Sequence, residues 1–206
     1  MGRAFSDILK SLVLAAALFF VIQALVQNYQ VFGASMEPSM HSGERIIVNK
    51  AAYLSVDLGK LSKFIPFYDK ADGSRVHLFG EPQRGDVVIV ESPNPPPDRL
   101  IKRIVGIPGD TVEIRSGTLY INGHPIEEPY VQGSTSILCR NGVEYPYDVL
   151  EDSYFIMGDN RTHSNDSRCL GPISRSDIVG KAWMAYWPLG DIGIVDSHAI
   201  EVPSDP

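Results

Sequence analysis

The sequence predicts a mainly β fold with antiparallel strands, preceded by one N-terminal transmembrane helix. One long apolar stretch lies near the N-terminus, and the apolar residues beyond it come in short runs separated by Gly, Pro, Asn and Asp. Short runs between turn residues are typical of strands. Beyond residue 30, a helical period of useful length is found only near Leu54–Leu61, so strands are expected to dominate.

The first predicted element is a membrane anchor over residues 8–26. No Asp, Glu, Lys or Arg occurs between Lys10 and Glu37, and residues 12–26 are apolar except for Gln23. At about 1.5 Å per residue, a helix over 8–26 reaches about 28 Å, close to the roughly 30 Å thickness of a bilayer's hydrocarbon core. The stretch is therefore long enough to span a membrane.

A cleaved signal peptide is the alternative interpretation of this stretch, because it has the same polarity and a similar apolar run. Cleavage needs small residues one and three positions before the cut. The nearest candidate site, after Ala34, has Phe32 at the third position. We therefore expect the helix to be retained.

The charges that flank the anchor predict its orientation. Arg3, Lys10 and the terminal amine precede the span, whereas Glu37 and Glu44 follow it. Positive charge favours the cytoplasmic side. The expected segments are a cytoplasmic N-terminus at 1–10, the anchor at 8–26 and an extracytoplasmic β-rich domain at 27–206.

The predicted strands of this domain are short apolar runs. Asn122-Gly123 has the residues that a tight hairpin turn requires. Ser92–Pro97 is expected to be a stiff, polyproline-like loop between two strands, and Glu201–Pro206 a frayed tail. The segment Phe64–Tyr68 is expected to be an ordinary loop, with a membrane-facing lip as the alternative. The strand runs are 45–50, 86–91, 100–106, 111–115, 119–121, 154–157 and 179–187.

The composition argues against two kinds of partner. The chain has 18 Lys and Arg against 25 Asp and Glu, a net charge of −7, whereas nucleic-acid binding needs a basic face. Cys139 and Cys169 have neither CxxC spacing nor a neighbouring His cluster, so a zinc site is unsupported. They are either free thiols or one disulfide, and their number does not decide between the two.

Ser35 and Lys102 are the candidates for nucleophilic chemistry. A serine hydroxyl needs a base, and none of the five His residues forms an obvious Ser/His/Asp pattern. On a strand over 100–104, alternation places Lys102 on the same face as Leu100 and Ile104. Burial there would lower the pKa of the amine and make it a base. An edge-strand lysine with its amine in water is the structural alternative.

A third polar segment, residues 158–168, directly follows the apolar run 154–157. It reads Gly-Asp-Asn-Arg-Thr-His-Ser-Asn-Asp-Ser-Arg, which is more polar and charged than a plain turn requires. A solvated loop is the alternative for this segment taken alone, since Asp, Asn and Ser are good turn formers.

Together these segments resemble the type I signal peptidases, also called leader peptidases. That family has a Ser-Met-x-Pro motif after the anchor, an Arg-x-x-Lys-Arg-x-x-Gly strand and a Gly-Asp-Asn-Arg-x-x-Ser-x-Asp-Ser-Arg loop. All three occur here in family order, and a further family segment is matched by Arg84-Gly85-Asp86. They lie at 35–38, 99–106 and 158–168. The resemblance runs from the anchor to about Trp187 and implies a Ser/Lys protease β fold.

The resemblance implies roles for individual residues. Ser35 would attack the scissile carbonyl, Lys102 would remove its proton, and Ser164 would hydrogen-bond the lysine amine and orient it. Asp166 and Arg168 would form a supporting ion pair. A second pair is expected between Asp159 and Arg103, whose side chain alternation directs away from Lys102.

The resemblance also implies how the oxyanion is held. The backbone amide of Ser35 would be one donor. In one branch of the family a serine hydroxyl two residues before the nucleophile is a second donor, but this chain has Gly33 there. Other members also have Gly at this position, so the identity of a second donor stays open.

The implied substrate is a secretory preprotein with small residues, usually Ala, one and three positions before the cleaved bond. Its peptide would bind extended, pairing with strand edges near Ser35 and Lys102. No metal or organic cofactor is implied, and the expected partners are preproteins and the lipid bilayer, with no nucleic acid. The residues expected to line the substrate pockets are Val31, Gly33, Met36, Met40 and Ile101.

Two other functions are set below this one. A self-cleaving repressor-type peptidase shares the β scaffold and the Ser/Lys chemistry, but it cuts an Ala-Gly bond in its own chain. No Ala-Gly dipeptide occurs here, and a membrane span is unexpected in that class. A non-catalytic membrane-anchored β module would tolerate the loss of Ser35 and Lys102.

Overall fold

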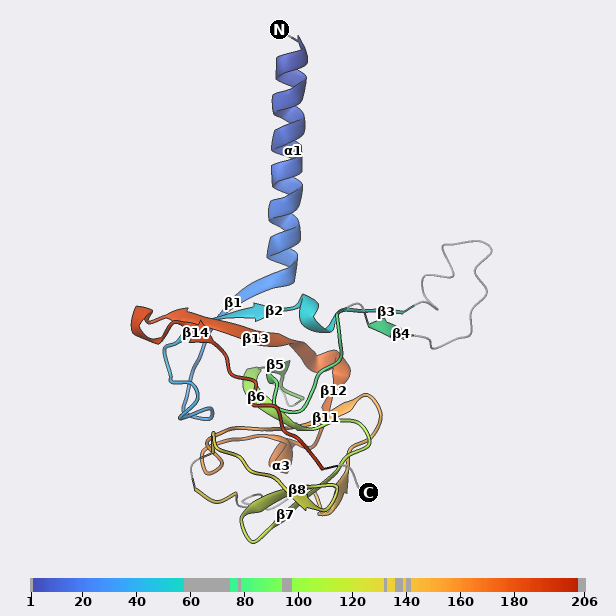
Figure 1. Cartoon of the computed structure of the whole chain (residues 1–206), viewed down its shortest axis with the longest axis vertical. Helices are drawn as coiled ribbons and strands as arrows, with labels where there is room; N and C mark the ends of the chain where they lie inside the picture. The colour runs from blue at the N-terminus through green and yellow to red at the C-terminus, as the bar shows by residue number, and fades with distance from the viewer. Residues whose placement is uncertain are drawn as a thin grey trace, which may run out of the picture.

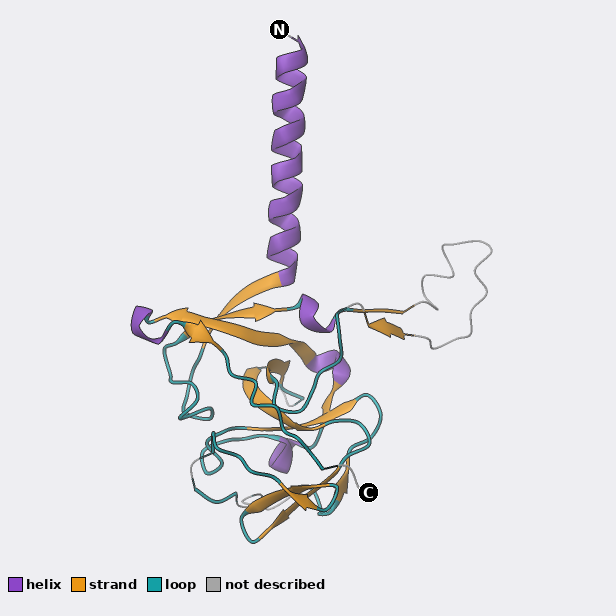
Figure 2. Cartoon of the chain, viewed as in Figure 1, coloured by secondary structure: helices purple, strands orange, loops and turns teal. Residues whose placement is uncertain are grey.

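A computed structural model describes residues 2–57, 75–77, 79–93, 98–131, 133–135, 139 and 142–203. The helix α1 projects away from a body of β-sheets, and the sheet strands nearest its base are β1 and β2 (Figure 1). Figure 2 shows that strands and loops make up most of that body. The anchor-proximal elements are α1 (Gly2–Leu25), β1 (Val26–Gln30) and β2 (Arg45–Asn49).

The helix α1 has the properties expected of a membrane span. Within it, Phe5–Leu25 is long and apolar enough to cross a bilayer, and the side chains of this stretch are not buried against the rest of the chain. An apolar surface of this length is stable in lipid but not in water. Because α1 continues directly into β1, the sheet body begins where the helix ends.

The largest sheet has eight strands, and every pairing in it is antiparallel. Its order is β1-β2-β13-β5-β6-β11-β12, with β14 paired to β13. The strands β1 and β12 are therefore the two ends of this order. The other members are β5 (Val87–Glu91), β6 (Arg99–Gly106), β11 (Ser153–Met157), β12 (Ile173–Ser174), β13 (Ile178–Trp187) and β14 (Gly193–Ile194).

Two smaller sheets and several short helices complete the described chain. A four-stranded sheet has the order β10-β7-β8-β9, and β3 pairs with β4. The strands are β3 (Ser55–Asp57), β4 (Arg75–His77), β7 (Thr111–Arg115), β8 (Thr118–Ile121), β9 (His124–Pro125) and β10 (Tyr147–Asp148). The helices are η1 (Ala51–Tyr53), α3 (Ser167–Leu170), η2 (Arg175–Asp177) and η3 (Leu189–Asp191).

The predicted strand runs are confirmed, each within one or two residues of a strand in the structure. The structure also contains a turn at Asn122-Gly123, where Asn122 has φ +53° and Gly123 φ +81°. The possible helix near Leu54–Leu61 is wrong over residues 55–57, which form the strand β3. Residues 58–61 and the segment Phe64–Tyr68 lie outside the described residues. The Ser92–Pro97 loop does join β5 to β6, but residues 94–97 lie outside the described part.

Among the described residues, three apolar clusters form the core, and one of them supports the loop that contains Ser35. That cluster joins the loop after β1 to strands β2, β5, β6 and β13. Burial of such side chains is the main favourable term in folding. The loop is thereby fixed against the sheet. The buried members of the cluster are Val31, Met36, Met40, Ile46, Val48, Val87, Ile89, Ile101, Ala182 and Ala185.

Candidate active site

Ser35 lies in a loop between β1 and β2 whose ends are joined by the backbone. The amide of Val31 donates to the carbonyl oxygen of Glu44 at 2.8 Å, and the amide of Gly43 donates to Val31 at 2.9 Å. Met36 and Met40 are both buried in the core, and the amide of Met40 donates to the oxygen of Met36 at 2.9 Å. These contacts leave Ser35 half-buried at the loop surface.

Lys102 lies on β6 with its amine at hydrogen-bond distance from the Ser35 hydroxyl. The two atoms, Lys102 Nζ and Ser35 Oγ, are 2.8 Å apart although the residues are 67 positions apart in sequence. Lys102 Nζ also donates to the carbonyl oxygen of Ile101 at 2.9 Å. The predicted proximity of serine and lysine is therefore present in the structure.

Burial changes the acid–base behaviour of Lys102. The residue is only 3% exposed, so the alternative of a solvated edge-strand lysine is wrong. Burial lowers the pKa of Lys102 from 10.5 to about 8, while the charges of Asp166 and Asp159 act in the opposite direction. Removing an ammonium group from water disfavours its charged form. About a tenth of the amine is thus neutral at pH 7 and about half at pH 8, and the neutral form is the one that general-base catalysis requires.

A groove of about 500 Å³ opens beside Ser35 and Lys102. Its walls come from β1 and from the first half of β6, with Ile46 and Ile89 between them. Along β6, residues 99–102 pair with β5 only, and β1 pairs with β2 only, within the described residues. Both walls therefore have backbone edges that are free to bind an extended chain.

The polar segment 158–168 packs against the backbone of Ser35. The amide of Asn160 donates to the carbonyl oxygen of Ser35 at 3.1 Å. Gly158 lies between the carbonyl oxygen of Ser35 and the side chain of Ser164. A Cβ on Gly158 would collide with both. The segment is thus part of the site and is not a solvated loop.

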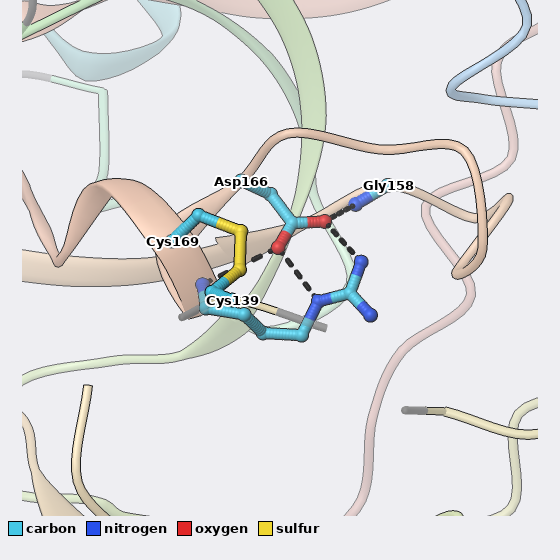
Figure 3. The surroundings of a disulfide bond; sticks show 5 residues. Cys139, Gly158, Asp166 and Cys169 are labelled. Carbon is cyan, nitrogen blue, oxygen red and sulfur yellow. Dashed lines mark hydrogen bonds and ion pairs between the residues drawn. A yellow bond between two sulfur atoms is a disulfide. The ribbon is translucent and has the colours of Figure 1, made fainter. Parts of the chain in front are cut away.

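Both predicted ion pairs of this segment are present. Arg103 Nε and Nη2 donate to the two carboxylate oxygens of Asp159 at 2.9 and 2.7 Å, and both side chains are almost completely buried. Arg168 donates twice to Asp166 at 2.8 Å, and Asp166 also accepts from the amide of Gly158 at 2.9 Å (Figure 3). Paired geometry of this kind offsets the cost of burying the charges.

The predicted hydrogen bond from Ser164 to Lys102 is not present in this structure. Among the described residues, the Ser164 hydroxyl is buried and has no hydrogen-bond partner. The lysine amine instead donates to Ile101 on its own strand, because the side chain can fold back toward its neighbouring carbonyl. Ser164 is nonetheless adjacent to Gly158 and Ser35. Its orienting role stays a prediction.

Comparisons with known proteins show the family to which the chain belongs. The family described as signal peptidase, peptidase S26, matches residues 5–187. The chain is similar to a signal peptidase I of Bacillus amyloliquefaciens, with 36% identity over 89% of this chain and 86% of that protein. A signal peptidase I of Bacillus licheniformis is 34% identical over 91% of each chain. The chain belongs to the signal peptidase family.

A solved structure of a signal peptidase I from Enterococcus faecalis V583 also matches, at 33% identity and a TM-score of 0.43. It covers 50% of this chain and 97% of that one. Membership of the signal peptidase family confirms the predicted enzyme class, a serine endopeptidase that removes signal peptides. It also confirms the predicted mainly β fold with an N-terminal apolar helix.

The residues predicted to line the pockets of this signal peptidase divide into three groups. Val31 and Ile101 line the groove beside Ser35. Met36 and Met40 do not line it; both are buried in the core cluster that supports the loop, and Met40 lines a different pocket together with His41 and Glu44. Gly33 is exposed at the loop surface with φ +80°, a conformation that favours glycine.

The two cysteines of this signal peptidase form a disulfide, a point that the sequence left open. Cys139 and Cys169 are bonded, with Cα atoms 5.3 Å apart. Cys169 directly follows Arg168, and its amide donates to the carbonyl oxygen of Asp166 at 2.8 Å. Figure 3 shows the disulfide beside the Asp166 carboxylate. The bond therefore ties a distant segment to the end of the polar loop.

Sequence reasoning also missed how Arg161 is held. It belongs to the matched loop motif, but two of its partners, Glu128 and Thr135, lie outside every motif. Among the described residues, no group of three or more His, Cys, Asp or Glu side chains is arranged to hold a metal ion.

Proposed function

We propose that Ser35 is the nucleophile and Lys102 the general base of this peptidase. The observation that carries the proposal is the 2.8 Å separation of Lys102 Nζ and Ser35 Oγ at a buried amine. A base within hydrogen-bond distance of a hydroxyl is the arrangement that nucleophilic catalysis needs. The lowered pKa of Lys102 supplies the neutral amine.

In the acylation step, neutral Lys102 accepts the hydroxyl proton of Ser35 as Ser35 Oγ attacks the scissile carbonyl carbon. The resulting ammonium then gives this proton to the leaving amine as the peptide C–N bond breaks. The signal peptide remains attached to Ser35 as an ester, and the mature chain leaves with a free amino group.

In the deacylation step, Lys102 takes a proton from water as the water attacks the ester. The same proton returns to Ser35 Oγ when the ester bond breaks, which regenerates the free serine. The hydrogen bond from Lys102 to Ile101 O keeps one N–H of the amine occupied. The nitrogen lone pair of the neutral amine then accepts the proton of the reacting hydroxyl, 2.8 Å away.

The oxyanion in each tetrahedral intermediate accepts a hydrogen bond from the backbone amide of Ser35. The loop that contains this amide is held by buried Met36 and by Asn160, whose amide binds the Ser35 carbonyl. A donor that is fixed before reaction costs no reorganisation during it. Gly33 has no hydroxyl, so this proposal assigns one donor only.

The substrate binds as an extended strand between β1 and β6. Their free edges supply backbone hydrogen bonds on both sides of the groove. Val31 and Ile101 line this groove with branched apolar side chains close to Ser35, which leaves room for small residues near the cleaved bond. This geometry supports secretory preproteins with small residues before the cut as substrates.

The lipid bilayer is the second proposed partner, with α1 spanning it and the N-terminus in the cytoplasm. The strand β13 lies close to the base of α1 (Figure 1). Apolar side chains on β13 and on the segment that follows it are about half exposed or more, and tryptophan favours the membrane interface. These side chains support contact between this end of the domain and lipid. They are Trp183, Trp187, Leu189, Ile192 and Ile194.

A truncated protein tests the separation of anchor and catalytic domain. The cut belongs between Leu25 and Val26, because a start at Asn28 would remove part of β1 and of the groove wall. We expect the protein starting at Val26 to cleave a soluble signal-peptide substrate almost as fast as the full chain. Cleavage of a membrane-inserted preprotein should fall by about 10²-fold or more, because the anchor raises the effective concentration of enzyme at the bilayer.

The measurement is kcat/KM of both proteins on both substrates, with thermal unfolding to check that the truncated domain is folded. The full chain on the soluble substrate is the reference. Equal loss on the two substrates would mean that α1 shapes the active site itself, and the division into anchor and catalytic domain would be wrong.

A further inference from the structure

Gly158 holds a central place in the site, and its position depends on hydrogen bonds to both of its backbone groups. The amide of Gly158 donates to Asp166, and its carbonyl oxygen accepts from Arg161 Nε at 3.1 Å. Gly158 packs directly against the carbonyl oxygen of Ser35. The placement of Ser35 relative to Lys102 therefore depends on Arg161 as well as on Asp166.

Arg161 is buried and is held by two side chains from outside the polar loop. Its Nη1 donates to Glu128 Oε2 at 2.8 Å and to Thr135 Oγ1 at 2.6 Å, and its Nη2 donates to Glu128 Oε1. The Arg161 side chain is 1% exposed and that of Glu128 is 9% exposed. A buried guanidinium without its carboxylate would be an uncompensated charge, so Glu128 determines where Arg161 can lie.

The same segment contacts the second arginine of the site. Tyr130 donates its hydroxyl to Glu128 Oε1 at 3.0 Å, and its ring lies against the guanidinium of Arg103, 4.1 Å from the ring centroid. Arg103 follows Lys102 on β6 and binds Asp159. Glu128 and Tyr130 thus connect the strand that contains the base to the loop that packs on the nucleophile.

We propose that Glu128 is a positioning residue for catalysis, which acts through Arg161 and Gly158 to hold Ser35 beside a Lys102 amine that is shielded from water. The inference rests on the proposed roles of Ser35 and Lys102. Gly158 of the polar loop packs on the carbonyl oxygen of Ser35, and the Ser35 hydroxyl is 2.8 Å from Lys102 Nζ, so the loop is linked to the amine through Ser35. Movement of that loop admits water to the amine and raises the pKa of Lys102 again.

The test compares full-length Glu128→Gln and Glu128→Ala with wild type on a soluble signal-peptide substrate. We expect Glu128→Ala to lower kcat by about 10²-fold with little change in KM, because displacement of a reacting group by about 1 Å costs this much. The acidic limb of the kcat/KM profile should move upward from about pH 8 toward 10.5. Glu128→Gln keeps one acceptor for Arg161, and its kcat should lie between the two. Glu127→Ala, at an exposed neighbouring glutamate, is the matched control and should match wild type.

A double variant separates positioning from stability. In Glu128→Met with Arg161→Met, the buried pair is replaced by apolar side chains of similar length, which restores stability to buried ion-pair sites in other proteins. We expect the thermal midpoint to recover while kcat stays low, because the Gly158 carbonyl has lost its Arg161 donor. Recovery of kcat together with the thermal midpoint in the double variant would overturn the proposal. Wild-type kcat and a wild-type pH profile in folded Glu128→Gln and Glu128→Ala would overturn it too.

Lys102→Ala in the same assay distinguishes this inference from the proposed function. If Lys102→Ala stays active, the proposed function fails; if it is inactive, the Glu128 results test this inference alone.

Discussion

Ser35→Ala and Lys102→Ala are each expected to lower kcat by at least about 10³-fold while the domain stays folded. The serine hydroxyl and the lysine amine act as one unit, so loss of either removes the same reaction path. Their contact is a single 2.8 Å hydrogen bond at the groove, and neither residue forms a buried ion pair with any residue that the structure describes. The measurements are kcat on a soluble signal-peptide substrate and thermal unfolding of each variant.

Lys102→Arg makes this test more specific. Arginine keeps a positive charge at any working pH and cannot accept the serine proton, so this variant should also be inactive. Lys50→Arg, at an exposed lysine, is the matched control and should retain full activity. Appreciable turnover by Lys102→Arg would show that Lys102 is not the base.

Gly158→Ala is expected to have the second largest effect, a loss of about 10²-fold or more in kcat. A Cβ at this position would collide with the carbonyl oxygen of Ser35 and with Ser164, so the nucleophile must move. Displacement of a reacting group by about 1 Å is enough for a loss of this size. We also expect a lower thermal midpoint, since overpacking a buried site is destabilising.

Gly190→Ala is the control for this prediction, because a Cβ there would meet nothing within 4 Å. It should leave kcat on the soluble substrate unchanged. If Gly158→Ala kept wild-type kcat, the contact between the polar loop and Ser35 would have no role in positioning the nucleophile.

Local sequence patterns were enough to predict most of the fold. Alternation of apolar residues and turn chemistry are properties of short segments, so β5, β6 and β11 were predicted within one or two residues. The same alternation placed Arg103 on the face opposite Lys102, and the Asp159–Arg103 pair is present. The family motifs predicted that Ser35 and Lys102 lie close together. Their spacing of 67 residues in the sequence could not predict this contact.

The features that were missed depend on contacts between distant segments or on side-chain conformation. Met36 and Met40 were expected to line the substrate groove, but both side chains are buried in the core cluster and neither lines the groove beside Ser35. The Lys102 side chain has four rotatable bonds, so its conformation is not determined by a sequence pattern. The sequence therefore could not predict that the amine binds Ile101 O instead of Ser164. Glu128 belongs to no motif, and only the folded chain brings it to Arg161, 33 residues away.

The pH dependence of kcat/KM tests the central claim most directly, because it reports the ionisation of the free enzyme's base. Lys102 must be neutral to act, so the rate should rise with pH through the pKa of its amine and fall below it. Burial puts that pKa at about 8, and the acidic limb of the full-length enzyme should lie there on a soluble substrate whose own groups do not titrate in this range. A limb near 10.5, the ordinary lysine value, would mean that the amine is solvated during catalysis, and it would contradict a buried Lys102 as the general base.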